Sequence, residues 1–406
     1  MSENEVKIEE KFIEQANLIA RGAEIIPNGV MELAKRLQEA EKNNKPLRVK
    51  LGLDPTRPDL HLGHTVVMRK LRLFQQFGHK VVLIVGGATA MIGDPSGKSQ
   101  TRPSLTKEEV ESNAKTYFEQ MDKVVNIKEA EVTNNANWLH KMGLVDLLKL
   151  ASNVTVAKLM TRDDFQKRYQ SGQPIAVHEF FYPLMQAYDS VVVDADIELG
   201  GTDQMFNLLL GREVQLAYGK ENPQLVFLLP LLEGTDGVLK MSKTYPQNCI
   251  SLTEEPKNMY GKLMSIKDEM IMRYYTLLTD KTDNELKEIE KRLKSGENPR
   301  NIKMELAYYI TKEYCGENNA NSAQEDFINV VQNHQAPEDI EEINAINKNI
   351  LDILVEKNFA KSKSEAKRLI QQGAVKFDDE KIDDINFVVT KSGIIKSGKR
   401  NYVKVV

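Results

Sequence analysis

The sequence predicts an α/β protein whose largest domain holds an open parallel sheet of the Rossmann type. Three consecutive segments predict this. Leucine and valine alternate with other residues over 47–53, which indicates a strand. Residues 60–78 place apolar side chains at helical spacing and end at Gly78, a common helix stop. The apolar run "KVVLIVGG" at 80–87 is typical of a strand buried on both faces. Strand, helix and strand in this order predict a βαβ unit with a right-handed crossover.

The first domain is expected to span residues 1–235, with a second half and an insertion. Thr106 and Glu109 in "SLTKEEVE" form a capping box, which predicts the start of a helix. Residues 107–175 have mostly helical patterns and predict a helical insertion between the two halves of the sheet. The segments "SVVVDADIELGG" and "QLVFLLPLL" predict two more strands, with a helix over 203–217 between them.

The remaining segments predict helices, a linker and a small terminal module. Residues 5–42 show helical periodicity with many charges, interrupted by "PNG" at 27–29. Residues 254–330 are rich in Leu, Lys and Glu, which predicts that the segment 236–332 holds a loop followed by an α-helical domain. The acidic residues 333–349 predict a linker. Residues 350–406 carry 12 Lys/Arg and 8 Asp/Glu, a net charge of +4 against -8 for the rest of the chain. This asymmetry suggests a nucleic-acid-binding module.

The composition is that of an ordinary globular protein and excludes several classes. The 406 residues are 41% hydrophobic and 28% charged, and the net charge of -4 argues against a general polyanion-binding surface. Cys249 and Cys315 form no C-x-x-C pair, so a structural zinc site is not expected. The polar N-terminus lacks the pattern of a signal peptide, and no long apolar run predicts a membrane span. We therefore expect a cytoplasmic protein.

His61 and His64 in "DPTRPDLHLGH" are the first candidate ligand-binding residues. Their spacing places them on one face of the first turn of a helix that follows a strand. Unpaired backbone N–H groups and the helix dipole favour an anion there, especially phosphate. Alternatively, the two side chains only cap or pack the helix. A metal site is less favoured because no third ligand stands nearby.

At this point the sequence resembles the class I aminoacyl-tRNA synthetases. "HLGH" is similar to their HIGH signature, and "KMSKT" at 240–244 is similar to their KMSKS signature, each with one replacement, Leu62 and Thr244. Over the whole chain the resemblance is to the bacterial tyrosyl-tRNA synthetases, through "LGLDPT", "GGATAMIGDPSGK", "YPLMQAYDS" and "GGTDQ". It implies activation of L-tyrosine with ATP to tyrosyl-adenylate and pyrophosphate, then transfer of tyrosine to the 3′ end of tRNA(Tyr). It also implies Mg²⁺ arriving with ATP, no protein-held metal, and a homodimer with the 107–175 insertion near the interface.

The resemblance assigns residues to the nucleotide. Gly234 and Gly237 precede Lys240 and Lys243, and a flexible loop would let these lysines close over the pyrophosphate, although an exposed lysine-rich turn is the plainer interpretation. The loop "MIGDPSGKSQTR" resembles a P-loop, but Ile92 occupies the position of the first glycine. The further residues that the resemblance places at ATP and its phosphates are Asp54, Thr56, His61, Gly63, His64, Lys98, Arg102, Gly201 and Asp203.

A second group of residues is assigned to tyrosine. Tyr182, Gln186 and Asp189 share one face of a predicted helix, which fits a polar pocket but also an ordinary solvated helix. The resemblance places Tyr182 and Gln186, with Asp94, at the ammonium group and Asp189 at the phenolic hydroxyl. Gln204 would hold the carboxylate. Lys50 stands where the best-known bacterial branch has a tyrosine that contacts the substrate hydroxyl, so this second hydroxyl contact is an open question.

The basic C-terminal segment resembles a small α+β RNA-binding module that is shared with a small-subunit ribosomal protein. In "KSKSEAKRLIQQG" a short helix would present Lys363, Lys367 and Arg368, and Gly373 would end it. These cations would contact RNA phosphates and give salt-sensitive affinity. A solvated amphipathic helix is the alternative.

Three other functions fit parts of the sequence. A tryptophan-specific relative shares the fold, but Asp189, Tyr182 and "LDPT" favour tyrosine. An RNA-binding protein on an inactive synthetase scaffold would not need both histidines and both loop lysines. A small-molecule nucleotidylyltransferase also uses H-x-G-H, but it would not need the helical domain or the basic tail.

Overall fold

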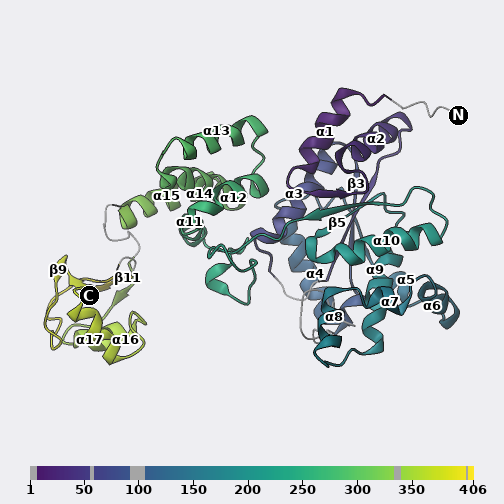
Figure 1. Ribbon diagram of the computed structural model, residues 1–406. Helices are drawn as coiled ribbons and strands as arrows, with labels where there is room; N and C mark the ends of the chain where they lie inside the picture. Colours follow the sequence, from purple (N-terminus) through teal and green to yellow (C-terminus); the bar gives the residue numbers. More distant parts are fainter. Residues whose placement is uncertain (1–6, 55–58, 92–105, 333–339, 399–400) are drawn as a thin grey trace. The chain divides into compact units, whose positions relative to one another are not determined.

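The computed structural model describes residues 7–54, 59–91, 106–332, 340–398 and 401–406. They form two compact units (Figure 1). The first contains residues 1–254 and 265–302, and the second contains residues 255–264 and 303–406. In the described part of the chain, no helix is both long and apolar enough to cross a membrane.

The first unit is built on a six-stranded sheet in the order β1-β6-β5-β2-β3-β4. All neighbours from β6 to β4 pair in parallel, and β1 pairs antiparallel with β6 at one edge. The strands are Glu24–Ile26 (β1), Arg48–Leu53 (β2), Lys80–Val85 (β3), Glu131–Asn134 (β4), Ile197–Gly201 (β5) and Leu225–Leu229 (β6).

The strand order reverses direction at β2. The chain runs outward from β2 through β3 to β4, and then returns to the other side of β2 for β5 and β6. Ligands bind open α/β sheets beside such a reversal, at the carboxyl ends of the strands. The crevice between the ends of β2 and β5 is therefore the expected ligand site. The parallel order of these strands also confirms the predicted Rossmann-like fold class.

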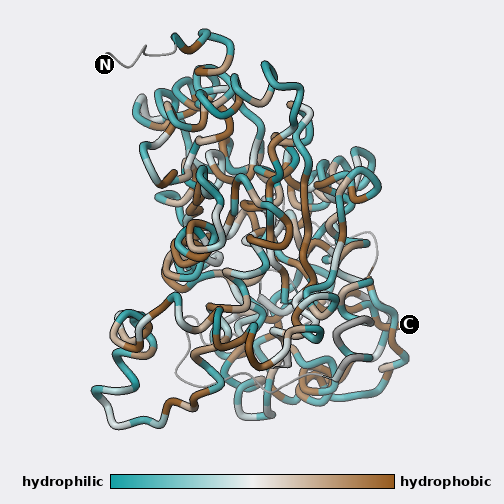
Figure 2. The backbone as a smooth tube through the Cα atoms, turned by 90° about the vertical axis from the view of Figure 1, so that its right-hand side faces the viewer, coloured by the Kyte–Doolittle hydropathy of each residue, from teal (hydrophilic) through white to brown (hydrophobic). Residues whose placement is uncertain are grey.

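Helices cover both faces of this sheet. Val226 and Leu228 of β6 pack against Leu208 of α10, whereas Phe227 between them contacts Phe74 of α3, with ring centroids 5.7 Å apart. Figure 2 shows hydrophobic residues concentrated along the central strands and hydrophilic residues on the outer helices. The helices of this unit are Glu10–Ala20 (α1), Gly29–Lys42 (α2), Leu62–Gln76 (α3), Lys107–Met121 (α4), Ala136–Leu139 (α5), Leu144–Ala151 (α6), Val156–Leu159 (α7), Asp163–Gln170 (α8), Phe181–Val192 (α9), Met205–Ala217 (α10), Ile271–Leu278 (α12) and Asp283–Lys294 (α13).

Two short strands differ from the sequence predictions. β1 interrupts the predicted helical segment 5–42, and β4 lies within the predicted helical insertion 107–175. Both are edge strands of three and four residues, too short for an alternating pattern to be recognised. By contrast, the predicted capping box at Thr106 and Glu109 is present at the start of α4.

The second unit contains helices and a small α+β module. The helices are Pro256–Met264 (α11), Glu317–Phe327 (α15), and the part of Pro299–Cys315 (α14) from residue 303 onward. The module has five strands in the order β7-β11-β10-β8-β9 and two helices. These are Glu342–Ile343 (β7), Ile350–Glu356 (α16), Lys363–Gln371 (α17), Val375–Phe377 (β8), Glu380–Lys381 (β9), Gly393–Ser397 (β10) and Asn401–Val405 (β11).

The module begins earlier than residue 350. β7 pairs with β11 over residues 342–343, and Ala345 is buried in the core of the module. The predicted linker 333–349 therefore includes part of the module, because a two-residue edge strand has no readable pattern. Residues 333–339 lie outside the described residues.

Candidate active site

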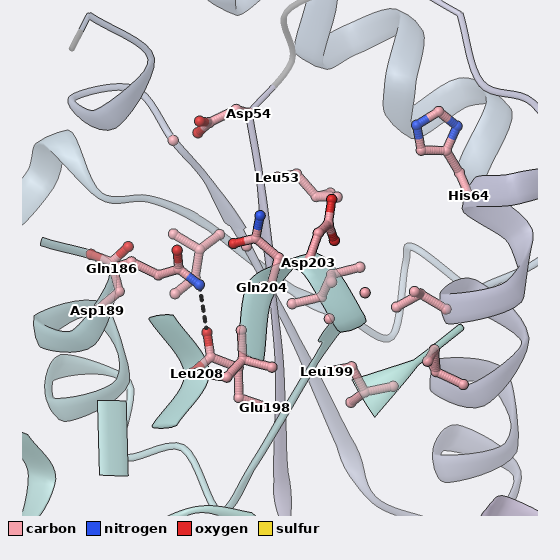
Figure 3. Close-up of a pocket in the computed structure, with 18 of the residues that line it drawn as sticks. Leu53, Asp54, His64, Gln186, Asp189, Glu198, Leu199, Asp203, Gln204 and Leu208 are labelled. Atoms are coloured by element: carbon pink, nitrogen blue, oxygen red, sulfur yellow. Dashed lines mark hydrogen bonds between the residues drawn. The ribbon is translucent and has the colours of Figure 1, made fainter. Parts of the chain in front are cut away.

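A cavity of about 330 Å³ opens at the carboxyl ends of β2 and β5. Side chains from three elements enter it: Asp54 after β2, Asp203 and Gln204 after β5, and the polar face of α9 (Figure 3). On the other side of the view, His64 projects from the first turn of α3. The cavity thus lies at the reversal of strand order, where the topology predicts a ligand.

The three polar residues of α9 line this cavity together, as their spacing predicts. These are Tyr182, Gln186 and Asp189. The Tyr182 hydroxyl donates a 2.7 Å hydrogen bond to Asp54 Oδ2, and Thr89 Oγ1 donates to the other oxygen of Asp54 at 3.1 Å. This contact joins the mouth of the site to the helix.

Asp189 is held by two donors that the sequence interpretation did not find. Trp138 Nε1 donates to Asp189 Oδ1 at 2.8 Å, and Asn135 Nδ2 donates to Oδ2 at 3.2 Å. Burial raises the pKa of Asp189 to about 7, against the opposite effects of Lys50 and of these two donors. Trp138 is the only tryptophan of the chain, but the sequence gives no sign that its N–H reaches Asp189 from a distant segment.

Lys50, whose contact with the tyrosine hydroxyl the sequence left open, is engaged by protein groups in the structure. Its side chain is fully buried, and Nζ lies 2.9 Å from the Gln186 carbonyl oxygen, 2.6 Å from Ser190 Oγ and 2.9 Å from Glu198 Oε1. An ammonium has three donors, so these acceptors use all of them. Lys50 has these partners because a buried ammonium needs a counter-charge, and Glu198 supplies it.

A second cavity of about 310 Å³ adjoins the first. It is lined by Asp59, by His61, and by the signature segment Lys240 to Thr244. Five residues line both cavities, and they are Gly63, His64, Tyr117, Asp203 and Leu231. The histidines and the loop lysines therefore line a cavity that adjoins the one lined by the polar face of α9.

The two histidines cap α3 and also line the second cavity. His61 Nδ1 accepts from the Gly63 N–H at 3.2 Å, and His64 Nδ1 accepts from the His61 N–H at 3.1 Å. Burial lowers the pKa of His61 to about 2 and that of His64 to about 4, with the Lys243 charge adding to both shifts. Both rings are therefore neutral and keep an Nε2–H donor, so capping and ligand binding are compatible.

The two signature lysines are paired with carboxylates. Lys243 Nζ lies 2.9 Å from Asp59 Oδ2, and Lys240 Nζ lies 3.7 Å from Asp203 Oδ2. These contacts compensate the positive charge in the second cavity. Gly201 makes room for this arrangement, because a Cβ there would lie 2.5 Å from Asp203 Oδ1.

Four predicted site residues cannot be placed. Thr56, Asp94, Lys98 and Arg102 lie outside the described residues. In the part of the chain that the structure describes, no group of three or more His, Cys, Asp or Glu side chains could hold a metal ion.

The three predicted RNA-binding residues of the C-terminal module lie on α17, which ends before Gly373 at a φ of +68°. Lys363, Lys367 and Arg368 are exposed. Lys363 pairs with Asp352 at 2.5 Å and Arg368 with Glu365 at 3.8 Å. After this helix, β8 and β9 form a hairpin, joined through Asp378 and Asp379 with positive φ.

Comparisons with known proteins give the family. Residues 42–332 match the model for tRNA synthetases class I (W and Y), and residues 332–405 match that of a tyrosine–tRNA ligase SYY-like C-terminal domain. The tyrosine–tRNA ligase of Thermotoga maritima is 52% identical over 94% of this chain and 96% of its own length. That of Carboxydothermus hydrogenoformans is 48% identical over 97% of both chains.

Solved structures support the same fold. The truncated mitochondrial tyrosyl-tRNA synthetase of Aspergillus nidulans matches with a TM-score of 0.63 and 21% identity over 78% of this chain and 93% of its own. The Archaeoglobus fulgidus tyrosyl-tRNA synthetase, solved with L-tyrosine, matches with a TM-score of 0.62 and 22% identity over 77% of this chain and 99% of its own. The family matches, at about half identity over nearly the whole length, establish that this chain belongs to the class I tRNA synthetases as a tyrosine–tRNA ligase.

Proposed function

We propose that the two adjoining cavities are the site at which this ligase activates L-tyrosine with ATP and then transfers it to tRNA(Tyr). The observation that supports this most is their shared lining, above all His64 and Asp203. An amino acid against α9 and a triphosphate against the signature loop would meet at this shared wall. The tyrosine carboxylate and the α-phosphorus of ATP could then approach each other.

In the proposed reaction a tyrosine carboxylate oxygen attacks the α-phosphorus, and the bond to the bridging oxygen of pyrophosphate breaks. Phosphoryl chemistry of this kind asks the protein mainly for position and charge stabilisation. The neutral Nε2–H groups of His61 and His64, with Lys240 and Lys243, would contact the phosphates. Mg²⁺ would enter as part of the ATP complex. Asp54, Gly63, Gly201 and Asp203 would bind the nucleotide.

On the amino-acid side, Gln186 and Tyr182 would contact the ammonium group and Gln204 the carboxylate. Asp189 would accept a hydrogen bond from the phenolic hydroxyl. Its two fixed donors orient the carboxylate before tyrosine arrives, which is the usual way a polar pocket is made selective. The assignments of Thr56, Asp94, Lys98 and Arg102 stay predictions of the family resemblance.

The remaining predictions concern assembly and tRNA. The exposed side chains Leu144, Val145 and Leu148 on α6, with Val156 on α7, support a homodimer that buries the insertion, because monomers rarely expose such apolar groups together. We propose that residues 236–332 contribute a helical tRNA-binding domain, and that Lys363, Lys367 and Arg368 contact RNA. The cytoplasmic location stays a prediction.

The test is ATP–pyrophosphate exchange with tyrosine, phenylalanine and tryptophan in turn. Exchange that depends on tyrosine supports the proposal. Exchange with tryptophan in place of tyrosine would favour the tryptophan-specific relative, and no exchange with any amino acid would favour an RNA-binding protein without activity. Aminoacylation of tRNA(Tyr) by the full chain then tests the second step.

A further inference from the structure

Beside the first cavity, which we call the tyrosine cavity, two oppositely charged buried side chains pair on one face of the sheet. Lys50 of β2 and Glu198 of β5 are register partners in adjacent parallel strands, so their side chains leave the same face of the sheet. Lys50 is fully buried, and Glu198 is 1% exposed. Glu198 still lines the cavity, whereas Lys50 does not. Glu198 is therefore part of the pocket wall, and Lys50 lies behind it.

Protein groups occupy the hydrogen-bonding positions of both the Lys50 ammonium and the Glu198 carboxylate. Besides Lys50, Glu198 Oε1 accepts from Gln186 Nε2 at 3.2 Å (the dashed line in Figure 3), and Oε2 accepts from Ser190 Oγ at 3.0 Å and from Gln224 Nε2. The packing is fitted to this network, because a Cβ on Gly211 of α10 would lie 2.6 Å from Gln224 Nε2. A direct contact of the Lys50 ammonium with substrate is thus disfavoured.

The hydrogen bond from Gln186 to Glu198 fixes the orientation of the Gln186 side-chain amide. A carboxylate only accepts hydrogen bonds, so Glu198 requires the NH₂ side of the Gln186 amide to face it. The amide oxygen of Gln186 then accepts from Asn207 Nδ2 at 3.1 Å, and the same nitrogen donates to Gln204 Oε1 at 2.9 Å. Asn207 therefore donates to both glutamines, and Gln186 donates in turn to Glu198, so each amide of this network has a defined orientation.

We propose that Lys50 and Glu198 are positioning residues for tyrosine, which fix the amide of Gln186 so that its oxygen is kept for the substrate ammonium group. This inference rests on the proposed assignment of Gln186 to that group. If the amide rotated, its NH₂ would face the ammonium and repel it. The ion pair acts through Gln186, because Lys50 is the counter-charge of the carboxylate that accepts from its amide.

A purely structural role is the competing explanation. Replacing a buried ion pair by apolar side chains is often neutral for stability, so the pair need not exist for folding alone. A structural role would change the thermal stability and the fraction of active protein. It would not selectively change the KM for tyrosine.

Two double variants separate these explanations. K50M/E198L removes both charges and the acceptor for Gln186, whereas K50M/E198Q removes both charges and keeps an amide oxygen that can accept from Gln186. In tyrosine-dependent exchange we expect K50M/E198L to raise the KM for tyrosine about tenfold or more, as for loss of a hydrogen bond to a charged group. The KM for ATP should stay within about twofold of wild type. K50M/E198Q should recover most of the loss.

The insertion offers a matched control. Arg168 of α8 and Glu179 form a second buried ion pair at 2.5 Å, and neither residue lines the tyrosine cavity. R168M/E179L should leave the KM for tyrosine unchanged. If the Lys50 doubles do not fold, S190A serves instead, because Ser190 Oγ links Lys50 to Glu198 Oε2. It should raise the KM for tyrosine about threefold.

An unchanged KM for tyrosine in K50M/E198L, or in S190A where that variant is used, overturns the inference. Equal KM values in the two doubles also overturn it, since orientation of Gln186 would then not matter. A wild-type protein without tyrosine-dependent exchange would overturn the proposed function instead. The two failures are therefore distinguishable.

Discussion

The two sides of the active site are prepared in different ways. On the amino-acid side Asp189, Gln186 and Glu198 are joined by hydrogen bonds to neighbouring side chains. On the nucleotide side the two signature lysines are partly exposed, and each is paired with a carboxylate. The hydrogen bonds on the amino-acid side fix its polar side chains for one shape of ligand. The nucleotide side holds charge that a phosphate can take over, because exposed ion pairs are weak.

The largest expected effect comes from the nucleotide side. Lys243→Ala removes a cation that would stabilise charge on the leaving pyrophosphate, and we expect adenylate formation to slow about 100- to 1,000-fold. The KM for tyrosine should stay near wild type. Pre-steady-state adenylate formation measures the effect, with Lys291→Ala on α13 as a control. A wild-type rate in Lys243→Ala would remove this lysine from the mechanism.

Next comes the selectivity of the amino-acid side. Asp189→Ala removes the acceptor for the phenolic hydroxyl, and we expect the preference for tyrosine over phenylalanine to fall about 10- to 100-fold. The ratio of kcat/KM for the two amino acids measures it. An unchanged ratio would show that another group reads the hydroxyl.

A smaller effect should follow from loosening Asp189. Trp138→Phe keeps an aromatic ring and removes the Nε1–H donor, so the carboxylate loses one of its two described fixed contacts. We expect the KM for tyrosine to rise about fivefold, with the KM for ATP unchanged. Equal rises in both constants would instead indicate a general disturbance of the fold.

The pH dependence should belong to the amino-acid side alone. The raised pKa of Asp189, about 7, means that the carboxyl is protonated below this pH and ionised above it. An ionised acceptor binds the phenol more strongly, so the KM for tyrosine should rise by up to about tenfold from about pH 8 to pH 6. Lys50, Glu198, Asn135 and Trp138 surround this carboxyl.

The control for this titration is Asp189→Asn, which should give a flat profile. His61 and His64 do not contribute between these pH values, because their pKa values of about 2 and 4 keep them neutral. A profile that persists in Asp189→Asn would assign the titration to another group.

The smallest effect should come from releasing a signature lysine. Asp59→Asn removes the carboxylate that faces Lys243 at 2.9 Å. Since a partly exposed ion pair contributes at most about 1 kcal/mol, the KM for ATP should fall by no more than about fivefold. Isothermal titration with ATP at low and high salt checks this. A rise in the KM would mean that Asp59 helps to bind the nucleotide.

The sequence predicted the parallel sheet well because long apolar runs such as β3 and β6 have few alternative structures. It missed β1 and β4, whose stability comes from pairing with a longer neighbour. The polar face of α9 was readable from spacing. The donors to Asp189 were not, because Asn135 and Trp138 reach it from a distant segment. Lys50 was assigned to substrate because a sequence does not show that Glu198 faces it across the sheet.

The pairing of Lys50 with Glu198 also limits how this pocket can change over time. Replacing either residue alone strands an opposite charge in the interior, which is strongly unfavourable. Substitutions of Lys50 and Glu198 must therefore occur together, so these two positions change rarely during evolution. Efforts to redirect the enzyme toward unnatural amino acids should diversify both positions as one unit in a library.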